Sequence, residues 1–192
     1  EVIKKYAAVP AGEPENAHPV KKSYGELKIT AAARLFDSLP QIAKEHKSIL
    51  PDYMEAYGQD HGFILYRTHV QGPRKDGHEF RIYGIHDRAM IFANGKHLDT
   101  IHRNEPERTV RFDIPAEGAT LDIFVENMGR INYGPYVCDP KGIAAAASGL
   151  QLLKDWTVYT MPMKDISKIK YGAADFIKGP AFYKAEIEID EP

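Results

Sequence analysis

"RAMIFANGKHLDTI", residues 88–101, is the stretch that decides the fold class of this chain. Asn94 and Gly95 stand between two extended runs of apolar and polar residues. A two-residue hairpin turn of type I′ needs positive φ at both central positions, and Asn-Gly adopts that geometry readily. The segment therefore predicts two antiparallel strands joined by a tight turn.

Further strands are predicted on both sides of this hairpin. Some of these segments alternate apolar and polar residues, and others are apolar on both faces and rich in aromatic and β-branched residues. They are "GFILYRTHV" (62–70), "HEFRIYGI" (78–85), "RTVRFDIP" (108–115), "EGATLDIFVEN" (117–127) and "GLQLLKDWTVYTMPM" (149–163), the last with Trp156 as a large packing residue. Strands spaced by roughly 8 to 15 residues, without βα alternation, predict an all-β antiparallel jelly-roll sandwich with short helical segments and irregular extensions.

The two ends of the chain have a different character. Residues 1–25 are rich in proline and glycine and are expected to be a linker. "AAARLFDSLPQIAKEHKS" (31–48) predicts a short helix interrupted at Pro40, which lacks a backbone N–H. "PDYMEAYGQ" (51–59) predicts a helical turn that ends at Gly58. The tail, residues 176–192, alternates as one strand with no partner strand after it.

Composition excludes several classes of partner. The chain has 192 residues, of which 43% are hydrophobic and 27% charged, with a net charge of −2 and a pI of about 6.5. These values suit a globular protein and argue against a nucleic-acid partner, which would need a concentrated basic surface. No apolar run approaches the roughly 18 residues that span a bilayer, so no membrane partner is expected. Cys138, the single cysteine, is expected to pack as a small hydrophobe rather than to act as a nucleophile.

Several side chains are candidates for catalysis or ligand binding. Carboxylates on predicted strands and loops are expected to be solvated surface charges rather than a glycosidase pair; they are Glu105, Glu107, Asp113, Glu117, Asp122 and Glu126. Asp87, near a strand end, is expected to cap a turn. The eight histidines follow no metal-ligand spacing, and no phosphate-binding glycine motif occurs. No cofactor is expected.

The segment "ENMGRINYGPYVCDPKGI" (126–143) concentrates glycine, proline, asparagine and arginine. We expect a fixed loop whose glycines permit positive φ and whose arginine binds loop carbonyls or a carboxylate. A second interpretation is a carbohydrate-binding surface, because sugars stack on aromatic rings and hydrogen-bond to amides and guanidinium groups. Its candidate residues are Tyr133, Arg130, Asn132 and Asn127.

Four segments, in this order, together resemble the region that follows the catalytic barrel in the family 35 glycoside hydrolases, the β-galactosidases. They are "YGQDHGFILYRTHV" (57–70), "IHDRAMIFANGKHLDTIHR" (85–103), "LDIFVENMGRINYG" (121–134) and "DPKGI" (139–143). "KDWTVYTMPM" (154–163) and "GPAFYKAEIEI" (179–189) are similar to that family as well. The resemblance covers residues 20–192.

The resemblance implies a division of labour within a longer parent chain. The family places both catalytic glutamates on a barrel that precedes this region, so no catalytic residue is assigned here. Residues 1–46 would be a linker after the barrel, 47–163 a galactose-binding-like β-sandwich, and 164–192 a linker and the first strand of a second β-domain.

The resemblance also sets expectations for partners. The barrel and the second β-domain of the same chain would be the partners, possible galactoside contact would come second, and a structural calcium is left open. An extracellular or periplasmic location fits the family. The alternative is an independent lectin-like carbohydrate-binding module.

Overall fold

The structure is a computed structural model that describes residues 22–189. Strands dominate this range. In chain order its elements are β1 (Ile29–Arg34), α2 (Leu35–Ile42), β2 (Lys44–Ser48), the 3₁₀ turn η1 (Met54–Tyr57), β3 (Phe63–Val70), β4 (Arg74–Tyr83), β5 (Arg88–Ala93), β6 (Lys96–His102), β7 (Thr109–Ile114), β8 (Ala119–Glu126), β9 (Ala145–Ser148), β10 (Gln151–Leu152), β11 (Trp156–Met161) and β12 (Ala181–Ala185).

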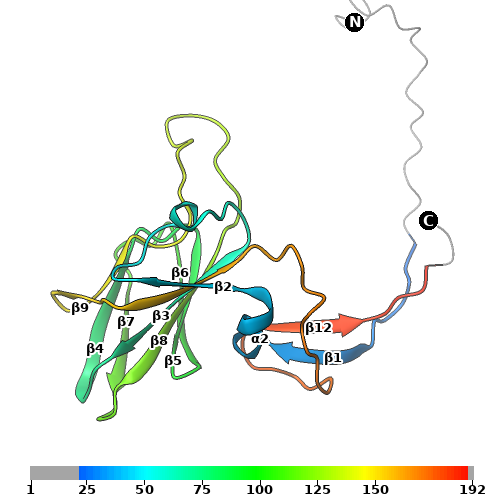
Figure 1. The fold of residues 1–192 in the computed structure, drawn as a ribbon, viewed down its shortest axis with the longest axis horizontal. Coiled ribbons are helices and arrows are strands. Elements are labelled where there is room, and N and C mark those ends of the chain that lie inside the picture. Colours follow the sequence, from blue (N-terminus) through cyan, green and yellow to red (C-terminus); the bar gives the residue numbers. More distant parts are fainter. Residues whose placement is uncertain (1–21, 190–192) are drawn as a thin grey trace, which may run out of the picture.

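Two antiparallel sheets pack face to face, which confirms the predicted sandwich (Figure 1). One sheet has six strands in the order β2-β11-β3-β8-β5-β6, and the other has four in the order β10-β9-β4-β7. The chain crosses between the sheets repeatedly, for example from β3 to β4 and back to β5, as in a jelly roll. The sandwich is therefore held by pairings between strands that lie far apart in the sequence.

The hairpin that decides the fold class forms as predicted. β5 and β6 pair antiparallel, with Ala93 opposite Lys96. Asn94 and Gly95 have φ values of 47° and 75°, the positive values that the sequence indicated. The Asn94 side chain also accepts a hydrogen bond from the Thr120 N–H at 2.9 Å, which ties the turn to the start of β8.

The main core lies between the two sheets. Trp156 is 1% exposed, its ring meets Tyr66 edge to face with centroids 6.5 Å apart, and its indole N–H donates to the Leu153 carbonyl at 3.0 Å. Tyr66 is also buried, and its hydroxyl donates to the Asp52 carbonyl at 2.7 Å. Large rings with satisfied polar groups give this core much of its apolar burial.

A second apolar cluster covers the outer face of the six-stranded sheet. Leu35 and Leu39 of α2 pack there against Leu65, Phe92 and Phe124. For this reason β8 is buried on both faces, whereas its alternating sequence predicted one solvated face. The predicted helix is present but shorter than expected, and Pro40 lies inside its last turn rather than interrupting it. The preceding residues 31–34 and the following residues 44–48 belong to strands.

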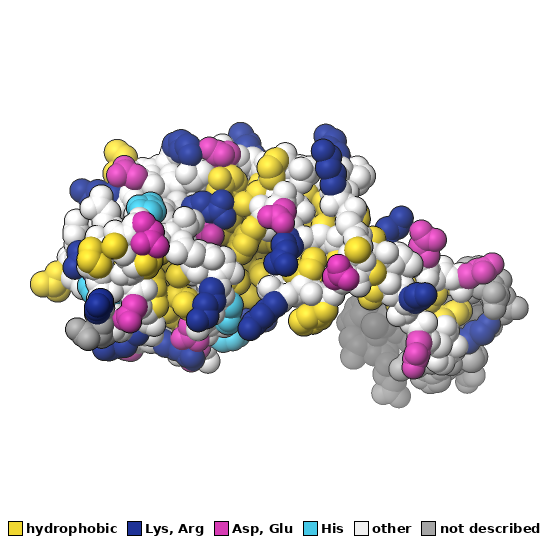
Figure 2. Space-filling model, turned by 90° about the horizontal axis from the view of Figure 1, so that it is seen from below, with side chains coloured by type: hydrophobic (Ala, Val, Ile, Leu, Met, Phe, Trp, Pro, Cys, Tyr) yellow, Lys and Arg dark blue, Asp and Glu magenta, His cyan; other side chains and the backbone are white. Residues whose placement is uncertain are grey.

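The extensions hold more structure than the sequence indicated. Residues 29–46 of the expected linker form β1, α2 and most of β2, while residues 1–21 of that linker lie outside the described range. The tail strand is also not solitary, because β12 pairs antiparallel with β1, 150 residues earlier in the chain. Figure 1 shows this two-stranded ribbon beside the sandwich and next to α2, and in Figure 2 the molecule narrows towards that end. The sequence did not indicate this pairing, because both strands are short and lie near opposite ends of the chain.

One strand was not predicted, and one local expectation was wrong. The alanine run at 144–147 forms most of β9, which pairs with β4 and β10, although alanine has a weak strand preference. Ala146 and Ala147 are buried, so tertiary packing overrides local propensity there. Cys138 is exposed rather than packed in the core, because it sits on the projecting loop described next.

Candidate functional site

The glycine-rich segment forms a long loop between β8 and β9 that projects above the sandwich (Figure 1). It contains all four residues that the sequence indicated for carbohydrate contact, and it descends at its far end into a buried cluster of charges. Both features lie at the same end of the sandwich, so we take the loop and its buried base as the candidate site.

Arg130 holds the loop in place, as the sequence indicated for this arginine. Its guanidinium donates to the Asp139 carbonyl at 2.8 Å and to the Asp60 carbonyl at 2.9 Å. The same group forms an ion pair with the Glu55 carboxylate at 2.5 Å. One side chain thus joins three segments of the chain, and its donors serve the fold rather than an open surface.

The other three candidates divide into one that is engaged and two that are exposed. The Asn127 amide donates to the Asp60 carbonyl at 3.1 Å and accepts from the Gly129 N–H at 2.9 Å. Tyr133 is 89% exposed, and Asn132 is exposed as well. The structure therefore brings Arg130 and Asn127 together on one carbonyl and leaves Tyr133 and Asn132 at the surface. Whether any of them contacts sugar stays a prediction.

Beneath the loop lies a network of four charged side chains that the sequence reading did not identify. Lys141 is fully buried, and its ammonium lies 2.8 Å from the Asp87 carboxylate and 2.7 Å from the Asp139 carboxylate. Arg103 adds a second cation, at 2.7 Å from Asp87 and 3.1 Å from Asp139. Two cations and two anions balance, which is what permits charges to be buried at all.

The network also fixes the backbone of the loop. The Asp87 carboxylate accepts from the Met128 N–H at 2.8 Å, 41 residues away, so it binds a distant segment and not the local turn that the sequence indicated. Lys141 N–H donates to the Glu55 carboxylate at 3.1 Å, and the His86 imidazole bonds to the Pro140 carbonyl at 2.7 Å. The signal in the sequence was the spacing Asp139-x-Lys141 in a segment with no helical periodicity, which places both side chains on one side of an extended chain.

Asp87 and Asp139 require a comparison with glycosidase chemistry. Both contact the Lys141 ammonium, at 2.8 Å and 2.7 Å, so they form a close pair of carboxylates, and a retaining glycosidase also uses a close pair. They are only 5% and 4% exposed, however, and their oxygens are engaged by Lys141, Arg103 and the Met128 N–H, although Asp87 also lines a cavity of about 390 Å³ beside Arg103. A retaining enzyme also needs an acid with a raised pKa. Asp139 does not provide one.

The pKa of Asp139 moves in the opposite direction to that of a general acid. Burial acts to raise it, but hydrogen bonds from the Lys141 ammonium and the Arg103 guanidinium outweigh burial and hold the pKa at about 2. The charged form is therefore favoured in the folded state relative to an ordinary aspartate of pKa 3.8.

This lowered pKa predicts a specific loss of stability in acid. Because the folded pKa lies below the unfolded one, the contribution of Asp139 is complete above about pH 5 and is lost as pH falls through 4 toward 2. The full effect is on the order of 2 kcal/mol. We expect the difference in unfolding free energy between the wild type and Asp139→Asn, measured in urea, to shrink over that range. A difference that stays constant from pH 5 to 2 would contradict this linkage.

Most of the carboxylates that were expected to be solvated surface charges are paired with an arginine. Four of them pair with an arginine: Glu105 with Arg108, Glu107 with Arg81, Glu126 with Arg88 and Asp122 with Arg67. Asp122 departs from the expectation of solvation, since its side chain is 3% exposed beneath α2. The strand alternation was right for the inner face, but the sequence did not show that the outer face is covered.

The part of the chain that the structure describes has neither a metal-binding cluster nor a membrane-spanning helix. Within residues 22–189, no group of three or more His, Cys, Asp or Glu side chains has a metal-binding arrangement. Over the same range, no helix has both the length and the apolar character to cross a bilayer.

Known proteins resemble the chain in the region that forms the sandwich. A family model described as "Beta-galactosidase, first all-beta domain" matches residues 51–162. The chain is 33% identical to a β-galactosidase of Xanthomonas manihotis over 84% of its length, and 34% identical to β-galactosidase 17 of Arabidopsis thaliana over 87%. A β-galactosidase of Homo sapiens is 30% identical over 89%. The alignments take in 26% of each relative, so the chain spans about a quarter of the length of the curated relatives it matches.

Proposed function

This chain belongs to the β-galactosidase family through its first all-β domain, and on that premise we propose that it supports the catalytic part of a longer β-galactosidase without performing catalysis. The observation that carries the proposal is the match of residues 51–162, which coincides with the sandwich and the loop 127–144. The parent would hydrolyse terminal β-galactosides with retention, as the family resemblance implies.

The division of the chain follows the same proposal. Residues 1–46 lead from a preceding barrel, 47–163 form the sandwich, and 164–192 lead into a second β-domain. Apolar residues of the β1–β12 ribbon support the last assignment, because Ile29 and Tyr183 are exposed on a sheet of only two strands. A two-stranded sheet is marginal alone and gains stability from further strands or packing.

The loop 127–144 is the surface that would meet the barrel. Its projecting part exposes Met128, Tyr133, Tyr136 and Val137, which are large apolar side chains gathered on one short segment. An exposed apolar cluster of this kind marks a contact surface. Arg130 and the buried network below hold both ends of the loop, which would reduce the ordering cost of docking.

The proposal predicts that the 192-residue chain does not hydrolyse an aryl β-galactoside above the blank. The buried carboxylates beneath the loop, Asp87 and Asp139, are both bound to Lys141 and Arg103, so neither is free to act as a nucleophile or an acid. Release of the chromogenic phenol at micromolar enzyme over hours is the measurement. Turnover that is abolished by Asp87→Asn or Asp139→Asn, in variants that remain folded by circular dichroism, would overturn the proposal.

One observation favours a second candidate function, an independent carbohydrate-binding module. Tyr133 lies 89% exposed on a loop whose two ends are joined by the Arg130–Asp139 hydrogen bond, which suits a stacking platform for sugar. Calorimetric titration with galactose and lactose separates the two functions. Micromolar binding that Tyr133→Ala abolishes would favour the module, and no binding heat would favour the supporting role.

A further inference from the structure

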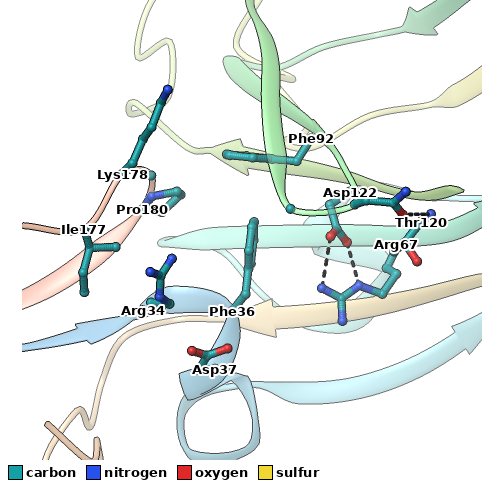
Figure 3. Close-up of a pocket in the computed structure, with 13 residues that line it drawn as sticks. Arg34, Phe36, Asp37, Arg67, Phe92, Thr120, Asp122, Ile177, Lys178 and Pro180 are labelled. Atoms are coloured by element: carbon teal, nitrogen blue, oxygen red, sulfur yellow. Dashed lines mark hydrogen bonds and ion pairs between the residues drawn. The ribbon is translucent and has the colours of Figure 1, made fainter. Parts of the chain in front are cut away.

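A cavity of about 410 Å³ lies away from the loop, between the outer face of the six-stranded sheet and the turn that precedes β12 (Figure 3). Segments far apart in sequence line it: the end of β1, the start of α2, the β5–β6 turn, β3, β8 and residues 177–180. Its volume falls in the range of small-ligand sites. Its chemistry is a combination of an aromatic wall and a charged rim.

The aromatic wall is formed by Phe36 and Phe92. Their rings meet edge to face with centroids 5.1 Å apart, and Phe92 is buried beneath. Arg67 lies on one side of the Phe36 ring, with its guanidinium carbon 6.0 Å from the centroid. Figure 3 shows Arg34 and Pro180 on the other side of that ring. The Phe36 ring is thus held from behind and faces the cavity.

Arg67 and Asp122 are charge-balanced with each other. The guanidinium donates to both carboxylate oxygens, at 2.6 Å and 3.1 Å, and the Asp122 side chain is almost fully buried. This bidentate geometry fixes Arg67, and with it the back of the aromatic wall. The pair therefore positions the wall and contributes no net charge to the cavity.

The rim carries charges that have no partner among the described residues. Arg34 and Lys178 form no ion pair there, and neither does the Asp37 carboxylate. The Asn94 carbonyl oxygen accepts from Thr120, so its amide nitrogen is left without a hydrogen bond in the same range. The rim thus offers two unpaired cations, one unpaired carboxylate and one free amide donor.

We propose that this cavity binds a sugar ring that carries a carboxylate, that is, a hexuronate. The ring would stack on Phe36, its carboxylate would lie between the Arg34 and Lys178 cations, and its hydroxyls would bond to Asp37 and Asn94. A neutral sugar leaves the two cations without a partner, and a simple carboxylate makes no use of the wall. This inference does not rest on the proposed function, since the cavity is separate from the loop 127–144 and from any galactoside chemistry.

The test is a titration of the ¹⁵N-labelled full chain, followed by two-dimensional NMR, with galacturonate, galactose and acetate in parallel. We expect saturable shifts with galacturonate, at a Kd on the order of 1 mM, centred on residues 34–37, 94–95 and 177–180. Galactose should bind at least tenfold more weakly, and acetate should give no saturable shifts in this region. Added salt should weaken galacturonate binding.

Matched variants identify the charged side chains that bind galacturonate. Arg34→Gln and Lys178→Gln are each expected to weaken galacturonate binding by roughly tenfold, because each removes a charge-assisted hydrogen bond. Lys47→Gln removes an exposed lysine that lies outside the cavity and should leave binding unchanged. Tyr133→Ala should also leave it unchanged, which separates this site from the loop.

Three outcomes would overturn the inference. They are equal binding of galactose and galacturonate, absence of saturable shifts at 20-fold the expected Kd, and binding that survives both charge substitutions with the fold intact. Shifts confined to residues 127–144 would assign galacturonate to the loop and would overturn it as well. Loss of the proposed supporting function would leave this result unaffected.

Discussion

Replacing Lys141 with methionine is expected to lower the free energy of unfolding by about 3–5 kcal/mol. The ammonium is fully buried and contacts both Asp87 and Asp139, so its removal leaves two buried carboxylates facing each other with Arg103 alone. Methionine fills a similar volume, so the loss reports charge rather than packing. Urea unfolding followed by circular dichroism measures it, and the melting temperature should fall by about 10 °C or more.

A control lysine shows that burial, rather than the loss of any ion pair, causes the effect. Lys47 pairs with Glu45 at 2.9 Å, but its side chain is 72% exposed. Lys47→Met should change stability by no more than about 0.5 kcal/mol. The double variant Lys141→Met with Asp87→Asn should be less destabilised than the sum of the single changes, because it removes one cation together with one anion. A Lys141→Met loss as small as that of Lys47→Met would show that water solvates the network.

Replacing Gly142 with alanine is expected to be the second severe change. Gly142 has φ of 119°, and a Cβ placed there would lie 2.1 Å from the Tyr66 hydroxyl oxygen. That hydroxyl is buried and engaged with Asp52, and Gly142 itself exchanges two backbone hydrogen bonds with His86, so neither side can move freely. We expect a loss of about 3 kcal/mol or more in unfolding free energy.

Gly129 is the matched control because it shares the backbone strain without the collision. Its φ is 104°, and a Cβ there meets no atom within 4 Å. Gly129→Ala should cost only the conformational strain, about 1–2 kcal/mol. The double variant Tyr66→Phe with Gly142→Ala removes the colliding oxygen and should be less destabilised than the sum of the two single changes. Equal effects at Gly142 and Gly129 would show that the loop base yields to the added methyl group.

The sequence predicted the loop of the candidate site but not the buried charges beneath it. The concentration of glycine and arginine in 126–143 indicated a fixed loop, and Arg130 binds carbonyls and a carboxylate as expected. The spacing Asp139-x-Lys141 did not indicate that Lys141 is buried, because a lysine is ordinarily expected at the surface. Its burial depends on Asp87, which lies 54 residues away, so only the fold makes the charge tolerable.

By itself, the sequence determined the sandwich, its hairpin and the strands with clear alternation, because strand alternation and an Asn-Gly turn are local properties of neighbouring residues. Only the tertiary structure decided which charges are buried, that β12 returns to pair with β1, and that α2 covers the outer face of β8. These features depend on residues that are distant in the chain and meet after folding. Local sequence patterns do not show which distant residues will contact each other in the folded chain.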